Sequence, residues 1–162
     1  MNNESARTPG LAARIGTALI VLWSVLHLWV CADGLVKFFA GDVKAQWLGL
    51  LGGTHAPTDA FVHTADAVTA NVQAHLLANF CVDVGGYGVL GLFAAWLIWK
   101  QASWLGYVLF LVLVGIADLA FTFSFVTSGI ITLNAGTLGG PVLWVLACAI
   151  TPFGLPRRGV SR

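Results

Sequence analysis

The segment HLLANFCVDVGGYGVLG (residues 75–91) lies inside a long apolar run that has the length of a membrane-spanning helix. It nevertheless carries four polar side chains spaced four residues apart, namely His75, Asn79, Asp83 and Tyr87. On an α-helix this spacing places them along one face. A charged side chain in hydrocarbon costs about 2.5–3.5 kcal/mol, so the pattern predicts a face that meets protein, a cofactor or water. A helix-packing seam whose polar groups satisfy one another is the alternative.

The composition of the whole chain indicates an integral membrane protein. Of its 162 residues, 58% are hydrophobic and only 9% are charged, whereas soluble domains contain about 25% charged residues. The net charge of +1 argues against a nucleic-acid partner. The three cysteines, Cys31, Cys81 and Cys148, are far apart in apolar segments and form no CxxC motif. We therefore interpret them as small buried hydrophobic residues.

Four apolar segments predict an all-α fold of four transmembrane helices in one antiparallel bundle that takes the whole chain, 1–162. The predicted spans are about 14–33, 72–99, 104–127 and 140–155. The link between the second and third spans is so short that it requires a helical hairpin. Trp96, Trp99 and Trp104 surround Lys100 there, as in the aromatic belt of a membrane interface. A signal peptide cleaved after Ala32 is the alternative for the first span, but the apolar region is long for that purpose.

The connection of residues 34–72 is expected to begin with a short amphipathic segment at the membrane surface. Gly52, Gly53 and Pro57 then break it. His55 and His63 follow, but Pro57 interrupts any shared helical face, so a solvent-side loop is favoured over a metal site.

The basic residues predict the orientation of the bundle. Six of the eight fall on one side of the membrane, and Lys37 and Lys44 fall on the other. The six are Arg7, Arg14, Lys100, Arg157, Arg158 and Arg162. The positive-inside rule then places both termini in the cytoplasm, as in a multi-pass protein of the inner (cytoplasmic) membrane, with the long connection outside.

With this topology, three helices are expected to bring ionisable groups into the outer half of the bundle. His27 would lie about 9 Å from the outer end of its helix and His75 somewhat shallower, while Asp83 and Asp118 would lie about 15 Å deep. Helices joined by short links pack as neighbours. These side chains therefore predict one pocket, to which Thr122 is added because it lies one turn beyond Asp118.

Two histidines in a membrane pocket suggest haem b, because imidazole ligates haem iron. His27 and His75 together would hold a six-coordinate haem for electron transfer, whereas His75 alone would leave one iron position open for substrate. Asp83 and Asp118, removed from water, are candidates for acid–base chemistry. A proton or ion path and the handling of a quinone or lipid would use the same carboxylates, and the residues leave these alternatives open.

The chain also resembles the small four-helix membrane enzymes of the styrene oxide isomerase type. The resemblance covers nearly the whole chain in its four-span layout. It is carried by the pair Ala74–His75 and by three segments, GLVKFFAG (34–41), ADLAFTF (117–123) and GIITLNAGTLGGP (129–141). Two features depart from that family, because its asparagine follows the histidine at a different spacing and Thr122 lies on or near the position of an expected tyrosine.

The resemblance implies a b-type haem ligated by His75 between the subunits of a trimer. Its ferric iron would act as a Lewis acid that opens an epoxide to an aldehyde, with Asn79 and Asp118 lining the substrate side. A weaker resemblance to DoxX-like four-span proteins, in Arg14 and the GLVKFF stretch, implies a quinone-linked redox role instead.

We therefore expect a membrane-embedded, haem-dependent isomerase that acts on a small apolar substrate such as an epoxide and forms a homo-oligomer. The alternative is a non-catalytic membrane subunit, an electron-transfer component or a small transporter. The candidate catalytic residues are Asn79, Asp83, Asp118 and Thr122. The candidate haem ligands are His75, which is also the candidate metal ligand, and His27.

Overall fold

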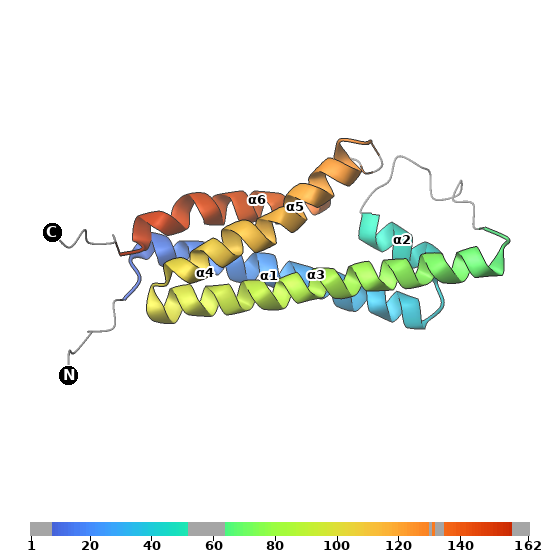
Figure 1. The fold of residues 1–162 in the computed structure, drawn as a ribbon, viewed down its shortest axis with the longest axis horizontal. Helices are drawn as coiled ribbons and strands as arrows, with labels where there is room; N and C mark the ends of the chain where they lie inside the picture. Colours follow the sequence, from blue (N-terminus) through green and yellow to red (C-terminus); the bar gives the residue numbers. More distant parts are fainter. Residues whose placement is uncertain (1–7, 52–63, 130, 132–134, 157–162) are drawn as a thin grey trace.

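Four long apolar helices pack as a bundle in the computed structural model, which describes residues 8–51, 64–129, 131 and 135–156 (Figure 1). This confirms the predicted fold class. The first two long helices are α1 (Leu11–Phe39) and α3 (Ala67–Gln101), with the short α2 (Val43–Leu51) between them. The third span consists of α4 (Trp104–Leu109), η2 (Phe110–Val114), α5 (Gly115–Phe121) and η3 (Thr122–Val126). The fourth consists of α6 (Ala135–Ile150) and η4 (Thr151–Gly154).

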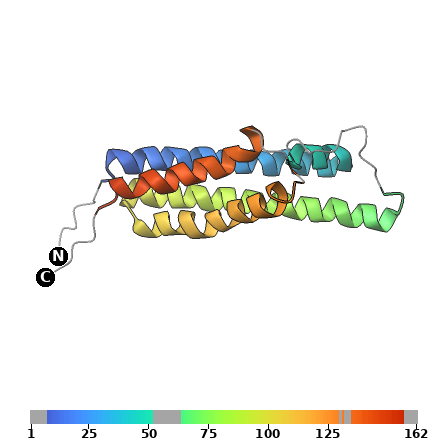
Figure 2. The ribbon, with the colours of Figure 1, turned by 90° about the horizontal axis from the view of Figure 1, so that it is seen from above.

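The helices form two layers. α1 and α6 make one layer, and α3 and the third span make the other (Figure 2). α1 is the central element because it packs most extensively on α3 and next on α6. The outward faces are apolar, with exposed Leu22, Val89 and Leu113 as examples, and these faces suit contact with lipid.

A seam of small residues brings α3 close to α1. A side chain added at Gly85, Gly88 or Gly91 would meet α1 within 3.0 Å, at Cys31 or Ser24. Packing of this kind replaces the hydrophobic driving force that is missing between helices in lipid. Gly86, on the outward side of α3, faces open space instead.

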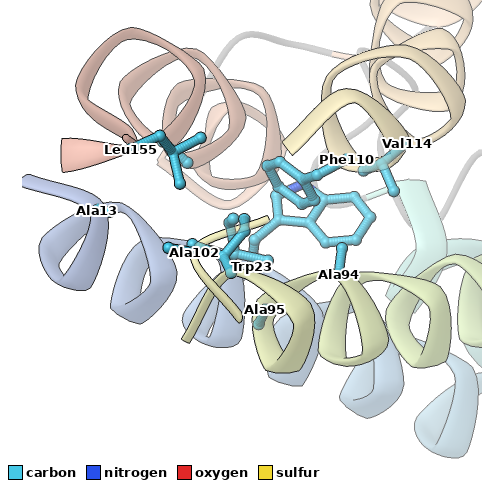
Figure 3. Packing of buried hydrophobic residues seen from close by; sticks show 11 residues of the cluster. Ala13, Trp23, Ala94, Ala95, Ala102, Phe110, Val114 and Leu155 are labelled. Carbon is cyan, nitrogen blue, oxygen red and sulfur yellow. The ribbon is translucent and has the colours of Figure 1, made fainter. Parts of the chain in front are cut away.

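The two chain termini lie at the same end of the bundle, which we call the terminal end (Figure 1). There the Gly10 N–H donates to the Gly154 carbonyl at 2.9 Å, and the Trp104 indole donates to the Pro156 carbonyl at 2.8 Å. Between this end and the middle of the bundle lies the apolar core, in which Trp23 and Phe110 are completely buried (Figure 3). α1, α3 and the third and fourth spans all reach the terminal end (Figure 1).

At the opposite end, α1 and α3 extend beyond the other two spans (Figure 1). α1 has 29 residues and α3 has 35, which correspond to about 43 Å and about 52 Å of α-helix. A bilayer core of about 30 Å needs only about 20 residues. The excess of both helices, together with α2 packed against them, forms an overhang beyond the hydrocarbon.

The predicted spans therefore need adjustment at this overhanging end. α3 begins at Ala67, five residues before the predicted start, because Asp66 caps it by accepting hydrogen bonds from Thr69. α1 runs through Ala32 without a break to Phe39. The predicted amphipathic segment is found as α2, although its first residues belong to α1. His55 and His63 lie outside the described residues.

Two π-helical turns, η2 and η3, interrupt the third span on either side of α5. The Thr127 N–H donates to the Thr122 carbonyl at 3.1 Å, which is the i→i+5 bond of a π-helix. Such turns bend helices, and the third span diverges from α3 towards its far end (Figure 1). α5, which carries Asp118, thus packs against α6.

Candidate functional site

A core polar cluster of Trp23, His27 and Asp118 lies inside the bundle. The indole N–H of Trp23 donates to Asp118 Oδ2 at 2.8 Å, and His27 Nε2 lies 3.7 Å from the other carboxylate oxygen, Oδ1. The imidazole of His27 stacks on the Trp23 ring with the ring centroids 3.5 Å apart. Asp118 is 5% exposed, so its charge depends on these partners rather than on water.

The contact of His27 with the backbone defines which ring nitrogen carries the proton. His27 Nδ1 lies 2.8 Å from the Trp23 carbonyl oxygen, one helical turn earlier. A carbonyl oxygen only accepts hydrogen bonds, so Nδ1 is protonated and the lone pair of a neutral imidazole is on Nε2. That lone pair faces a carboxylate oxygen. At 3.7 Å the two atoms leave room for a proton on either of them, or for a donor from a bound molecule.

His27 and Asp118 lie at the same depth, although they belong to different helices. Each is about 20 Å along its span from the terminal end, counting from Arg14 and Trp104. In a hydrocarbon layer of about 30 Å, this is the half that is farther from the termini. The cluster therefore combines burial within protein with a position inside the membrane.

α6 covers one side of the cluster with the backbone of a glycine. Gly140 lies opposite it, and an added Cβ there would be only 3.2 Å from His27 Cε1 and 3.3 Å from Asp118 Oδ1. Gly139 has open space around it. The side chain of His27 is 18% exposed, so the cluster is not completely closed.

Thr122 lies next to the cluster but does not contribute its hydroxyl to it. Its Oγ donates to the Asp118 backbone carbonyl at 2.8 Å. This intrahelical bond satisfies the hydroxyl at the start of the π turn η3. Thr122 therefore supports the helix that presents Asp118.

The other predicted site residues form a separate group, the α3 stripe, consisting of His75, Asn79 and Asp83. All three are exposed, and the Asn79 amide donates to Asp83 at 3.1 Å. His75 Nδ1 lies 2.8 Å from the Asn71 carbonyl, and the His75 ring meets Phe38 edge-on with the centroids 5.2 Å apart. Tyr87, the fourth member of the predicted ridge, instead turns inward and packs on the apolar core.

The α3 stripe crosses the expected edge of the hydrocarbon. Counted from Trp99, Asp83 lies about 24 Å along α3, Asn79 about 30 Å and His75 about 36 Å. His75 therefore belongs to the overhang, where an exposed imidazole reaches the headgroup region or water. Asp83 alone of the three remains inside the layer.

The prediction of one common pocket for all of these residues is consequently wrong. Asp118 faces protein as expected, but Asp83 is exposed on a side of α3 against which none of the described helices packs. His27 and His75 have different partners, since His27 points to Asp118 whereas His75 contacts Phe38. A haem held by both histidines stays a prediction.

Trp23 is the site residue that the sequence analysis missed. It contacts both His27 and Asp118, and it is completely buried. A usable signal was present, because Trp23 precedes His27 by four residues, the same spacing that defined the α3 stripe. Tryptophan in an apolar helix is read first as a packing or interface residue.

A fully buried glutamine and the cysteines are the other candidate ligands. Gln46 on α2 is buried next to Cys81 of α3. All three cysteines are free thiols. Within the described ranges, no three His, Cys, Asp or Glu side chains are grouped to hold a metal ion.

Comparison of the chain with protein-family models, with curated proteins and with solved structures finds no match. Fold and site define the class as a four-helix, multi-pass membrane protein in which a partly buried histidine faces a buried aspartate.

Proposed function

We propose that this protein is a membrane-embedded acid–base isomerase whose proton-transferring groups are His27 and Asp118. The observation that carries the proposal is the 3.7 Å approach of His27 Nε2 to Asp118 Oδ1. Both atoms bear lone pairs in the neutral-histidine form, and their side chains are only 18% and 6% exposed. A pair that shares one proton supplies an acid and a base side by side.

An isomerisation uses such a pair without consuming a co-reactant. With an epoxide, His27 Nε2–H protonates the ring oxygen while one C–O bond breaks. A hydride then migrates from the carbon that keeps the oxygen to the carbon that lost it. The O–H proton passes to Asp118 Oδ1 as the carbonyl forms, and its return to His27 restores the pair. Small apolar epoxides dissolve in lipid, and the part of the His27 side chain that remains exposed, 18%, is where they would reach the pair.

Activity on a phenyl-substituted epoxide, followed as appearance of the carbonyl product, tests this proposal. Asp118→Asn and His27→Asn should each reduce turnover by about 100-fold or more, the usual contribution of a positioned acid or base. His75→Ala is the matched control and should retain turnover. Full activity in Asp118→Asn would contradict the proposal. A wild type that binds the epoxide without converting it would point to a transporter or a non-catalytic subunit.

A haem-dependent isomerase with His75 as the axial ligand is the second candidate. The favouring observation is the bond from His75 Nδ1 to the Asn71 carbonyl, which leaves Nε2 exposed and free to bind iron. Asn79 lies one turn away on the same face. A ferric haem would supply Lewis acidity there. His75→Ala should then abolish both the Soret absorbance and the turnover of protein expressed with ample haem, while Asp118→Asn leaves both unchanged.

We also propose that a second copy of the chain covers Asp83, as in a homo-oligomer with the trimeric state that the resemblance implies. This carboxylate is exposed at a depth inside the hydrocarbon, and Asn79 is the donor that the chain itself provides. Gly86, which follows Asp83 by one turn of α3, has open space around it, and this space permits close approach of another helix. A Gly86→Cys variant should form disulfide-linked copies, whereas Leu113→Cys on the third span should not. A monomeric Gly86→Cys protein would contradict the interface.

The orientation that we propose has both termini in the cytoplasm of the inner (cytoplasmic) membrane. The distribution of basic residues supports it. A reporter fused after Arg162 should be cytoplasmic, and one inserted near Pro57 should be external. The reverse result would place the cluster in the cytoplasmic half.

A further inference from the structure

We propose that Trp23 keeps the shared proton on His27, so that His27 is the acid, Asp118 is the base, and the site selects ligands with a neutral acceptor oxygen. The inference deepens the proposed function and rests on the same histidine–aspartate pair. It assigns a positioning role to a residue that need not touch the substrate.

Trp23 contacts both His27 and Asp118, through its backbone carbonyl, the face of its ring and its indole N–H. Its backbone carbonyl accepts from His27 Nδ1–H at 2.8 Å. The face of its ring stacks on the imidazole, with an angle of 23° between the planes. Its indole N–H donates to Asp118 Oδ2 at 2.8 Å.

Each of these contacts favours the same protonation state. A hydrogen bond from a neutral N–H is stronger to a carboxylate than to a carboxylic acid, so the indole favours ionised Asp118. An aromatic face attracts a cation, so the stack favours the imidazolium form of His27. The Trp23 carbonyl, which accepts from His27 Nδ1–H, also favours the imidazolium form. Together they oppose desolvation, which by itself favours the neutral pair.

The surrounding groups do not offer another site for the proton. Cys148, on α6, is within electrostatic reach of Asp118. Tyr107, on α4, donates its hydroxyl to the Cys148 backbone carbonyl at 3.0 Å, so its proton is directed away from the carboxylate. Tyr87, on α3, packs on the apolar core.

The position of the proton determines which ligand fits. A protonated Nε2 is a donor, and Asp118 Oδ1 at 3.7 Å is too far for a normal hydrogen bond. An epoxide, ether or carbonyl oxygen that reaches the exposed 18% of the His27 side chain can accept from Nε2–H. The proposed ligand class is therefore a small apolar molecule with one such oxygen.

The test measures the protonation of His27 directly, by nitrogen NMR of protein labelled at histidine, at fixed pH. His27→Asn identifies the signal. In Trp23→Phe, which keeps an aromatic ring but loses the N–H, the ratio of imidazolium to imidazole at His27 should fall by about tenfold or more. The infrared band of protonated Asp118, identified by its loss in Asp118→Asn, should grow in parallel.

Trp144→Phe is the matched control. Trp144 also has a buried indole N–H, but this group has no hydrogen-bond partner in the described chain. Loss of the Trp144 N–H should therefore leave the ratio of imidazolium to imidazole at His27 unchanged. Equal effects of the two tryptophan variants, or a neutral His27 in the wild type at a pH where exposed histidines are charged, would overturn the inference. The wild-type measurement needs only His27→Asn, as the reference that identifies the signal.

The indole N–H of Trp23 provides a further readout in the wild type. Its NMR signal should shift together with that of His27 as the pH changes, whereas a signal that does not move would contradict the coupling. None of these readouts requires turnover. Correct proton placement without isomerase activity would therefore refute the proposed function and leave this inference standing.

Discussion

The core polar cluster and the α3 stripe contain the same kinds of side chain in very different surroundings. Each has a histidine whose Nδ1 lies 2.8 Å from the backbone carbonyl one turn earlier, and each has an aspartate. In the cluster, α1 and α5 bring the histidine and the aspartate together, and α6 covers them at Gly140. In the stripe, Asn79 of the same helix is the one hydrogen-bond partner of Asp83 among the described residues.

The difference shows what a run of polar residues in an apolar helix can and cannot indicate. Spacing by four establishes that side chains share a face, but it does not say what covers that face. Asp118 is a site residue because neighbouring helices supply a donor and a second titratable group. The α3 stripe acquires comparable surroundings only if another molecule is placed against it.

Removal of the two carboxylates should give the largest contrast. Asp118→Ala leaves the buried Trp23 indole without an acceptor and His27 without a counter-charge. It should lower the free energy of unfolding by about 3 kcal/mol. Asp83→Ala should change it by less than about 0.5 kcal/mol in a monomer in detergent. Thermal unfolding followed by circular dichroism measures both, and equal losses would remove the distinction between the regions.

A smaller contrast is expected between two adjacent glycines of α6. Gly140→Ala places a methyl group against both His27 and Asp118, and such overpacking costs about 1–3 kcal/mol. Gly139→Ala meets open space and should stabilise the helix by up to about 1 kcal/mol. The same unfolding experiment compares them. If Gly140→Ala were as stable as Gly139→Ala, the approach to the cluster would be wider than described.

Chemical accessibility should separate the two histidines without any mutation. His75 is exposed, whereas the side chain of His27 is 18% exposed and stacked on Trp23. Diethyl pyrocarbonate should therefore modify His75 readily and His27 several times more slowly, as measured by mass spectrometry of the resulting peptides. Protection of His75 in the purified protein would instead indicate that another copy or a bound group covers the stripe.

The smallest effect concerns the start of the helix that carries the stripe. Hydrogen bonds from the Thr69 hydroxyl and then from its backbone N–H hold the pKa of Asp66 below its ordinary value. A lowered pKa in the folded state gives stabilisation that is present at neutral pH and is lost as the pH falls through the folded pKa. The protection of the first turn of α3 against hydrogen exchange, measured relative to the unstructured rate at each pH, should therefore fall on acidification.

Two variants check that assignment. Asp66→Asn keeps an N-cap acceptor and should make the protection of the first turn nearly independent of pH in this range. Asp66→Ala should show low protection at every pH. Acid-sensitive protection that persists in Asp66→Asn would assign the effect to another group.

Much of the fold was predictable from the sequence because the membrane imposes simple rules on length and polarity. Four apolar runs gave four helices, and the short link around Lys100 gave the hairpin. The overhang of α3 was missed since residues 67–71 are too polar for a span, although Asp66 and Thr69 form a helix-capping pair.

The candidate site was predictable only in part, because it depends on contacts between distant segments. Asp118 and His27 were identified as unusual residues in apolar helices, and the structure brings them together. The outward position of Asp83 depends on which face of α3 meets α1, and the glycines at 85, 88 and 91 decide this. Trp23 was missed because its hydrogen-bonding group is a small part of a large apolar side chain.

The π turn η2 also has a consequence for how related chains should be compared. A π turn holds one more residue than an α turn, so η2 accommodates an extra residue while α4 and α5 keep their faces. A related chain that lacks one residue between Phe110 and Val114 would have an ordinary α-helix there, with its aspartate still directed inward. A one-residue gap at this point of an alignment therefore implies no loss of the site, whereas a gap within α5 would turn the carboxylate towards lipid.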